Sequence, residues 1–156
     1  KKNKLKLTKY CDRGIPDSVR GEIWKLLVGV HELKAEKKIN YRELLDSIDK
    51  NIEGSIKEQI LKDIGRTMPN HFLFREESGR QALDSVLSAY ATYNPQVGYC
   101  QAMNFITALF LMYMTEEDAF YLLLTMVEDW KFGGLWEPSL PYLQPCVYVF
   151  NSLLKV

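Results

Sequence analysis

The chain has 156 residues, about the length of one domain, and its 47% hydrophobic and 26% charged residues argue against disorder and suffice for a buried core. Its formal net charge is zero, but the charges are unevenly distributed, because five lysines and no acidic residue lie in the first nine residues. The rest of the chain has 15 basic and 20 acidic residues. This balance does not support a broad nucleic-acid-binding surface, which needs clustered lysine and arginine.

The first predicted elements are a lysine-rich leader over residues 1–12 and a helix that follows it. The leader is either a solvated extension, which we favour, or a segment that touches an anionic membrane. Apolar residues then recur at intervals of three and four from Val19 to Val30. Pro16 and Gly29 are typical of a helix start and a helix end, so they predict the limits of this helix.

The same helical spacing predicts three further helices, over residues 41–52, 56–64 and 83–90. Residues 100–113 are apolar nearly all round, which predicts a central helix that the others cover. Thr115 precedes three acidic residues and predicts another helix start, because a hydroxyl caps a helix and acids suit its dipole. No segment alternates with a period of two. The sequence therefore predicts an all-α fold, an irregular multi-helix bundle.

Near the end of the chain, residues 131–141 contain two glycines and two prolines and are predicted to form a loop. A further helix is expected from Cys146, directly after Pro145, to Val156. The sequence offers no capping signal at the end of this helix, so we expect the chain to be a truncated domain.

Several patterns look like chemical sites but are better explained structurally. Residues 49–56 match the first half of a calcium-binding loop, yet the twelfth position, which should be a bidentate carboxylate, would be Ile60, so a glycine turn between two helices is favoured. His71 has no partner in a nucleophile motif and is expected to make a local hydrogen bond. The three cysteines form no metal-binding motif, and no glycine-rich phosphate loop is present. We therefore expect no cofactor, no metal and no GTPase site in the chain itself.

Arg66 lies where one predicted helix is expected to end. Ile60 and Ile64 anchor one face of that helix, and Asp63 is close enough to Arg66 for a charge-assisted hydrogen bond that aims the guanidinium. Pro69 ends the helix, so the arginine is expected at an exposed terminus. The residue is either a surface ion pair, which spacing alone favours, or a functional guanidinium.

Gln101 follows a predicted turn from Tyr93 to Gly98, where an Asn-Pro pair starts the turn and the glycine allows an unusual backbone angle. We expect Tyr99 and Gln101 to open the central apolar helix. A glutamine in the first turn of a buried helix must find hydrogen-bond partners or face a cleft. A cap on free backbone N–H groups and a functional role both remain open.

Three short motifs occur together and in order: Arg20-x-x-x-Trp24, Ile60-x-x-Asp63-x-x-Arg66 and Tyr99-x-Gln101. The flanking stretches Arg66-Thr67-Met68-Pro69-x-His71 and Gly98-Tyr99-Cys100-Gln101-Ala102-Met103-Asn104 make the joint match specific. From about Arg13 to its end, the chain resembles the TBC domain, the Rab-type GTPase-activating module. The resemblance implies the N-terminal lobe of that domain over residues 13–130, then a loop and the start of the second lobe over residues 131–156.

The resemblance implies that Arg66 and Gln101 act in trans on a Rab-type small GTPase in its GTP form, as an arginine finger and a glutamine finger. Arg66 would neutralise charge that develops between the β- and γ-phosphates, and Gln101 would orient the attacking water. Asp63 would orient Arg66, and Tyr99 would position the Gln101 loop. GTP and Mg²⁺ would belong to the partner.

Arg20 and Trp24 are expected to be scaffold residues, with Arg20 paired to a carboxylate and Trp24 packed in the core of the lobe. A competing hypothesis is a non-catalytic helical module that binds a small GTPase or another partner. We expect a cytoplasmic protein of vesicle trafficking that approaches endomembranes through its partner. We expect no signal peptide, and the most apolar window, residues 105–114, is too short to cross a bilayer.

Overall fold

The computed structural model describes residues 11, 13–130, 132–137 and 139–154, so the predicted leader lies outside the described residues except for Cys11. The helices follow one another in the order α2 (Asp17–Val28), α3 (Val30–Lys37), α4 (Tyr41–Asn51), α5 (Gly54–Ile64), α6 (Phe72–Arg75), α7 (Glu77–Tyr93), α8 (Met103–Leu111), α9 (Glu116–Glu128), the 3₁₀ turn η1 (Phe132–Leu135) and α10 (Leu143–Leu153). None of the described residues forms a strand, and the predicted all-α fold is confirmed.

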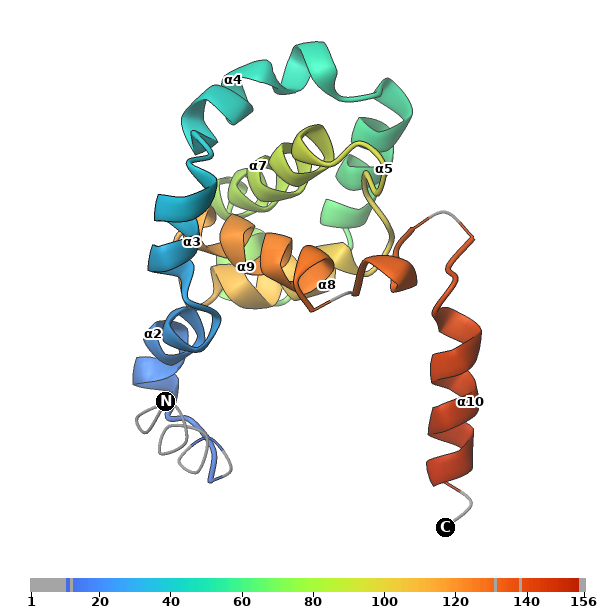
Figure 1. Cartoon of the computed structure of the whole chain (residues 1–156). Helices are drawn as coiled ribbons and strands as arrows, with labels where there is room; N and C mark the ends of the chain where they lie inside the picture. The colour runs from blue at the N-terminus through green and yellow to red at the C-terminus, as the bar shows by residue number, and fades with distance from the viewer. Residues whose placement is uncertain (1–10, 12, 131, 138, 155–156) are drawn as a thin grey trace.

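Two helices form the centre of the fold, α7 and α9, which pack against each other (Figure 1). Their side chains Leu83, Val86, Tyr90, Phe120 and Leu123 are completely buried, and each such burial stabilises the fold by about 1.5–3 kcal/mol. Helices α4, α5 and α6 pack on α7, α8 packs on both central helices, and α2 and α3 pack on α9. The two turns that carry the predicted site therefore connect elements anchored on this centre.

Helix limits follow the capping signals of the sequence. Pro16 precedes α2, and Gly29 ends it with φ +79°, a left-handed angle that glycine adopts without strain. The Asn40 side chain caps α4 by accepting a hydrogen bond from the Glu43 N–H. Thr115 caps α9 in the same way, because its hydroxyl accepts from the Asp118 N–H at 3.4 Å. The limits predicted for α2 and the start predicted for α9 are confirmed.

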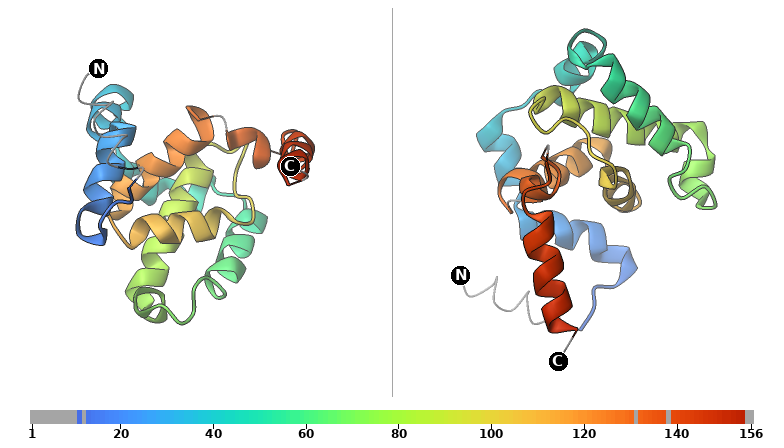
Figure 2. Two further views of the ribbon diagram at one scale, coloured as in Figure 1. Left: turned by 90° about the horizontal axis from the view of Figure 1, so that it is seen from below. Right: turned by 90° about the vertical axis from the view of Figure 1, so that its right-hand side faces the viewer.

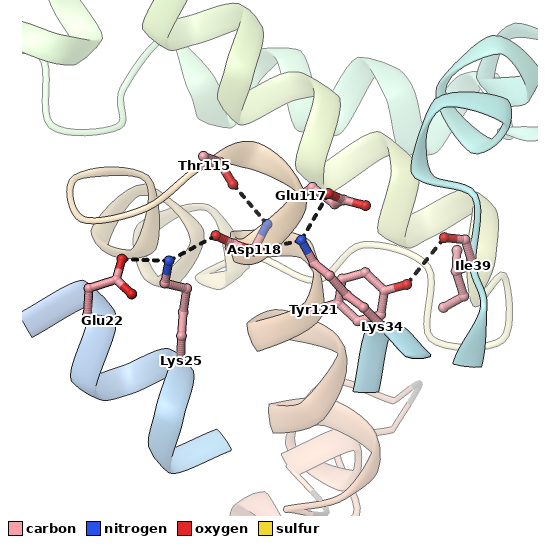
Figure 3. A network of polar contacts seen from close by, with 8 residues as sticks. All are labelled: Glu22, Lys25, Lys34, Ile39, Thr115, Glu117, Asp118 and Tyr121. Atoms are coloured by element: carbon pink, nitrogen blue, oxygen red, sulfur yellow. Dashed lines mark hydrogen bonds and ion pairs between the residues drawn. The ribbon is translucent and has the colours of Figure 1, made fainter. Parts of the chain in front are cut away.

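A cluster of ion pairs joins α2 and α3 to the first turn of α9 (Figure 3). The Lys25 ammonium lies 3.3 Å from one carboxylate oxygen of Asp118, and the Lys34 ammonium lies 2.7 Å from the other. Lys34 also contacts Glu117 at 2.9 Å, and Lys25 contacts Glu22 at 2.7 Å. Burial alone would raise the pKa of Asp118, but the hydrogen bonds and charges of the two lysines outweigh burial and hold it below its ordinary value.

The prediction of a covered central helix over residues 100–113 is wrong in two respects. Helix α8 begins only at Met103, and the chain before it forms a turn. Its outer side is apolar but uncovered, since Phe105 and Leu109 are 42% and 39% exposed. An all-round apolar composition therefore did not identify the most buried helix, which is α9.

No helix among the described residues combines the length and the apolar character needed to span a membrane.

Helix α10 stands apart from the other helices in Figure 1, and the left view of Figure 2 shows it end-on beside them. None of its residues is buried. Its beginning is held by Tyr142, which lies against Gly134 of η1 and donates its N–H to the Gly134 carbonyl at 2.9 Å. The helix begins at Leu143, before Pro145 rather than after it, because a proline in the first turn removes no helical hydrogen bond.

Candidate functional site

Helix α5 carries Arg66 just beyond its C-terminal end. Ile60 and Ile64 are buried in the core, as predicted, and anchor the helix there. After Ile64 the chain turns, with the Arg66 N–H bound to the Asp63 carbonyl at 3.2 Å and the Thr67 N–H to the Ile64 carbonyl at 3.0 Å. The Arg66 side chain is 54% exposed. The structure therefore places this guanidinium at an exposed helix terminus.

The Asp63 carboxylate is buried and links Arg66 to Tyr99. Its Oδ1 atom accepts from Arg66 Nε at 2.8 Å and contacts Arg66 Nη2 at 2.6 Å, so the predicted charge-assisted hydrogen bond is present. Its Oδ2 atom accepts from the Tyr99 hydroxyl at 2.6 Å. Burial and this hydrogen bond raise the pKa of Tyr99, which keeps the phenol protonated as a donor. One carboxylate thus orients the arginine and fixes the residue two positions before Gln101.

Gln101 lies in the turn between α7 and α8. Gly98 has φ +60° and donates its N–H to the Asn94 carbonyl at 2.8 Å, which confirms the predicted turn. Tyr99 is buried, whereas Gln101 is exposed, and its amide has no hydrogen-bond partner in the described part of the chain. Gln101 precedes the first residue of α8, so the expectation that it opens the helix is wrong. The chain is not helical there because Ala102 adopts φ +85°.

A second connection between the two turns runs through buried hydrogen bonds. The Thr67 hydroxyl donates to the Asp63 carbonyl at 2.6 Å and accepts from Asn104 Nδ2 at 2.7 Å. The Asn104 Oδ1 atom accepts from the Ala102 N–H at 3.1 Å. Thr67 and Asn104 are 2% and 0% exposed, so these bonds are shielded from water. The turn of Arg66 and the turn of Gln101 are therefore joined twice, through Tyr99 and through Asn104.

Both turns contain a residue other than glycine in the left-handed region. Met68 has φ +44°, and Ala102 has φ +85° with ψ −20°. Such a conformation costs a residue with a Cβ atom about 1–2 kcal/mol, so it persists only where surrounding contacts enforce it. At Ala102 the hydrogen bond to Asn104 is such a contact.

Arg20 and Trp24 lie in α2, and both contact Tyr113. The Arg20 guanidinium pairs with Asp17, contacts the Tyr113 hydroxyl at 2.6 Å and lies over the Tyr113 ring. Trp24 packs edge-to-face on Phe110 and Tyr113, with ring centroids 6.2 and 5.2 Å away. The expected carboxylate pair is present, and Trp24 packs against the core but is only partly buried.

The patterns that resembled other chemistry have structural explanations. Residues 49–60 comprise the end of α4, a connection of two residues and the first turns of α5, so the expected break between two helices is present, although Gly54 already belongs to α5. His71 accepts the Leu73 N–H at 3.3 Å and caps α6, which confirms the local hydrogen bond. Within the described residues, no three histidine, cysteine, aspartate or glutamate side chains cluster as metal ligands would.

Comparison with known proteins decides the family. The family model described as the Rab-GTPase-TBC domain matches residues 17–156. The chain belongs to the TBC family. The TBC chain is 32% identical over 157 residues to the human ecotropic viral integration site 5 protein homolog, a match that covers 99% of the chain and 18% of that relative.

Two solved structures resemble this TBC chain. The flagellar RabGAP TBC domain of Chlamydomonas superposes with a TM-score of 0.72 at 34% identity, over 80% of this chain and 43% of that one. The Ypt/Rab-GAP domain of Gyp1p gives a TM-score of 0.75 at 22% identity, over 97% of this chain and 59% of that one, and so supports the fold alone. The chain spans less than two thirds of each of these proteins.

Motifs and family resemblance predicted Arg66, Gln101, Asp63 and Tyr99 as site residues of the TBC chain but no role for Thr67 and Asn104. A signal for Asn104 existed, since an asparagine near the start of an apolar stretch must find a partner if it is buried. Its partner lies 37 residues earlier. Nothing in the local sequence specifies such a distant contact.

Proposed function

We propose that this chain is the part of a GTPase-activating protein that accelerates GTP hydrolysis by a Rab-type small GTPase in its GTP form. One observation carries the proposal: Arg66 and Gln101 are both exposed, and buried hydrogen bonds join the turns from which they project. The chain's membership of the Rab-GTPase-TBC family supports the class of partner.

Arg66 would supply positive charge to the transferring phosphoryl group of the partner's nucleotide. A guanidinium carries five N–H donors in a fixed plane and suits phosphate oxygens. Nε and Nη2 are engaged by Asp63, while Nη1 has no partner among the described residues. The carboxylate thus fixes the plane of the guanidinium and leaves donors for the partner. In the small GTPase Ras, an arginine supplied by the activating protein accelerates hydrolysis by roughly 10³–10⁵.

Gln101 would orient the attacking water, because its amide offers both a donor and an acceptor. Its exposed amide has no partner in the described residues, so binding a GTPase would not require it to break an internal hydrogen bond. The bond from Tyr99 to Asp63 holds the backbone near Gln101 against α5. The nucleotide and Mg²⁺ would be those of the partner.

The test measures phosphate release from a panel of GTP-loaded Rab proteins by stopped flow, using the whole protein that contains this chain. Arg66→Ala should lower the acceleration by roughly 10³-fold or more. It should also lower the melting temperature somewhat, because it leaves the buried Asp63 carboxylate with Tyr99 as its only side-chain donor in the part of the chain that the structure describes, so the rates are compared where both proteins are folded. Arg42→Ala removes an equally charged and exposed side chain from α4 and is the matched control.

Unchanged acceleration by Arg66→Ala would contradict the proposed mechanism. Stable binding of a GTP-loaded Rab with no acceleration by the unmodified protein would instead favour a non-catalytic binding module.

A further inference from the structure

Buried groups behind the two exposed residues form a continuous chain of hydrogen bonds from α5 to the turn before α8. It runs from the Asp63 carbonyl through the Thr67 hydroxyl and the Asn104 carboxamide to the Ala102 N–H, with donor–acceptor distances of 2.6, 2.7 and 3.1 Å. We propose that Asn104 is a positioning residue for Gln101, which it places by holding Ala102 in its left-handed conformation and tying this turn to that of Arg66. The inference deepens the proposed function and rests on it for its effect on hydrolysis.

The direction of the hydrogen bonds makes the role of Asn104 specific. The Ala102 N–H requires an acceptor, so Oδ1 must face it and Nδ2 must face Thr67. The Thr67 hydroxyl has a single hydrogen, which it donates to the Asp63 carbonyl, so it can only accept from Asn104. These hydrogen bonds can all form in only one orientation of the Asn104 carboxamide. A reversed carboxamide would place N–H against N–H at Ala102.

The backbone angle of Ala102 shows why such a device is needed. At φ +85° an alanine is strained, and its exposed side chain makes no buried contact that could enforce the angle. The hydrogen bond from its own N–H to Asn104 acts directly on the peptide unit that joins Gln101 to Ala102. The Met103 N–H also bonds the Cys100 carbonyl across this turn at 3.1 Å, so losing the Asn104 bond would weaken the turn and let Gln101 take other directions. Helix α8 would stay anchored through Met103, which is completely buried.

The first test follows amide hydrogen exchange by NMR in the unbound protein, with alanine-selective ¹⁵N labelling, and needs no GTPase. Although Ala102 is exposed, its N–H should be protected from exchange. Asn104→Leu should lower that protection roughly tenfold or more, and Thr67→Val should lower it without touching Ala102, whereas Thr67→Ser should keep it. Exchange of this amide at the unprotected rate in the unmodified protein would overturn the inference.

The second test measures kcat and KM for a GTP-loaded Rab that the protein accelerates. Asn104→Leu should lower kcat by roughly ten- to a hundredfold with little change in KM. Ala102→Gly should rescue much of this loss, because glycine adopts the left-handed angle without help. The matched control is Thr107→Val, which removes a buried α8 hydroxyl that has no partner among the described residues and should leave both constants unchanged.

A purely structural role for Asn104 predicts other outcomes. It predicts that Ala102→Gly does not rescue kcat. It also predicts that Asn104→Leu lowers kcat in the Gln101→Ala variant as much as it does in the unmodified protein. A positioning role predicts that Asn104→Leu lowers kcat hardly at all once Gln101 is absent. Either structural outcome would overturn the inference. Should Asn104→Leu fail to fold, Thr67→Val breaks the same series of hydrogen bonds, and the same loss of kcat is expected. If the unmodified protein accelerates no Rab, the proposed function fails, and the exchange result still decides whether Asn104 holds the turn.

Discussion

The Asp63 carboxylate divides its two oxygens between the two motifs of the site. Oδ1 holds Arg66, and Oδ2 accepts from Tyr99, which lies 36 residues later. A buried carboxylate that loses one of its two hydrogen-bond donors is left partly unsatisfied. The free energy of unfolding then falls by more than it would on loss of an exposed hydrogen bond. Each motif therefore depends on the other for stability as well as for geometry.

Tyr99→Phe should lower the free energy of unfolding by about 1.5–3 kcal/mol, because it removes a buried hydrogen bond to a charged group and nothing else. Urea denaturation measures this difference. Tyr148→Phe removes the hydroxyl of a residue on α10 that is 75% exposed, and should leave the free energy of unfolding unchanged. Equal values for the two variants would show that the bond to Asp63 contributes no stability.

Gln101→Ala should lower the acceleration of GTP hydrolysis most when the partner Rab lacks its own switch glutamine, by roughly a hundredfold. The reason is that no second amide could then orient the water. Gln96→Ala, an exposed glutamine in the same loop, is the control. Phosphate release measures both, and a rate equal to that of the unmodified protein with such a Rab would refute a glutamine supplied in trans.

Close approach of neighbouring elements is decided by small residues, as the start of α7 illustrates. A Cβ atom added at Gly79 would collide with the backbone carbonyl oxygen of Leu73 in α6. Backbone cannot move aside as the tip of a side chain can. The angle between α6 and α7, and with it the path of the chain after Arg66, therefore depends on the absence of a side chain at this position.

Gly79→Ala should lower the free energy of unfolding by about 1–3 kcal/mol, the usual cost of overpacking. Gly54→Ala is the matched control, since a Cβ atom in the first turn of α5 meets nothing within 4 Å. The control should be neutral or slightly stabilising, because alanine loses less entropy than glycine in a helix. Thermal and urea denaturation compare them. A Gly79 variant as stable as the control would mean that α6 shifts at no cost.

Helix positions could be predicted from the sequence where a cap or a strong apolar period marked them. Pro16, Gly29 and Thr115 mark real helix limits. Helix α3 could not be predicted, because residues 30–37 are largely polar, with only a few apolar side chains to reveal a face. The cover expected over α8 is missing because composition reports how apolar a face is and not whether another element lies on it.

The site could be predicted only as far as local patterns and family resemblance reach. Spacing within one helix predicted the Asp63–Arg66 hydrogen bond, and it is present. The Thr67–Asn104 bond joins residues 37 positions apart, and no periodicity encodes such a contact. The strain at Ala102 is also invisible in the sequence, since alanine ordinarily favours a right-handed helix.

At the scale of the molecule, α2 and α3 are joined to the centre through ion pairs as well as through apolar packing. Hydrogen bonding to Glu22 and Asp118 raises the pKa of Lys25 despite its partial burial. Burial would lower the pKa of Lys34, but Asp118 and Glu117 outweigh it and raise the value. A second contact, between Lys37 and Glu128 at 2.9 Å, fastens the end of α3 to the end of α9.

Asp118→Asn should lower the free energy of unfolding at neutral pH by on the order of 1 kcal/mol, since its partners are partly exposed. Because the pKa of Asp118 is lowered from 3.8 in the folded state, its stabilisation is fully present above that value and is lost as the pH falls through the lower folded value. The difference from the unmodified protein should therefore begin to shrink below about pH 5 and keep shrinking as the pH falls past 3.8 toward the lower folded value.

Urea denaturation over that pH range tests this dependence. Asp46→Asn, an exposed aspartate on α4, is the control and should show little difference at any pH. If the stability difference between Asp118→Asn and the unmodified protein grew as the pH was lowered, the stabilising ion pairs of Asp118 with Lys25 and Lys34 would be contradicted.

The hydroxyl–amide contact of Thr67 and Asn104 has a consequence for anyone who wishes to transplant these loops. Copying the segment around Arg66 into another helical scaffold would carry over the guanidinium and its aspartate, but leave behind an asparagine encoded 37 codons downstream. A chimera would have to exchange both segments at once, with the stretch of α5 and α8 that sets the spacing between them. The smallest portable unit is therefore the continuous segment from α5 to α8, because both of these helices pack on α7.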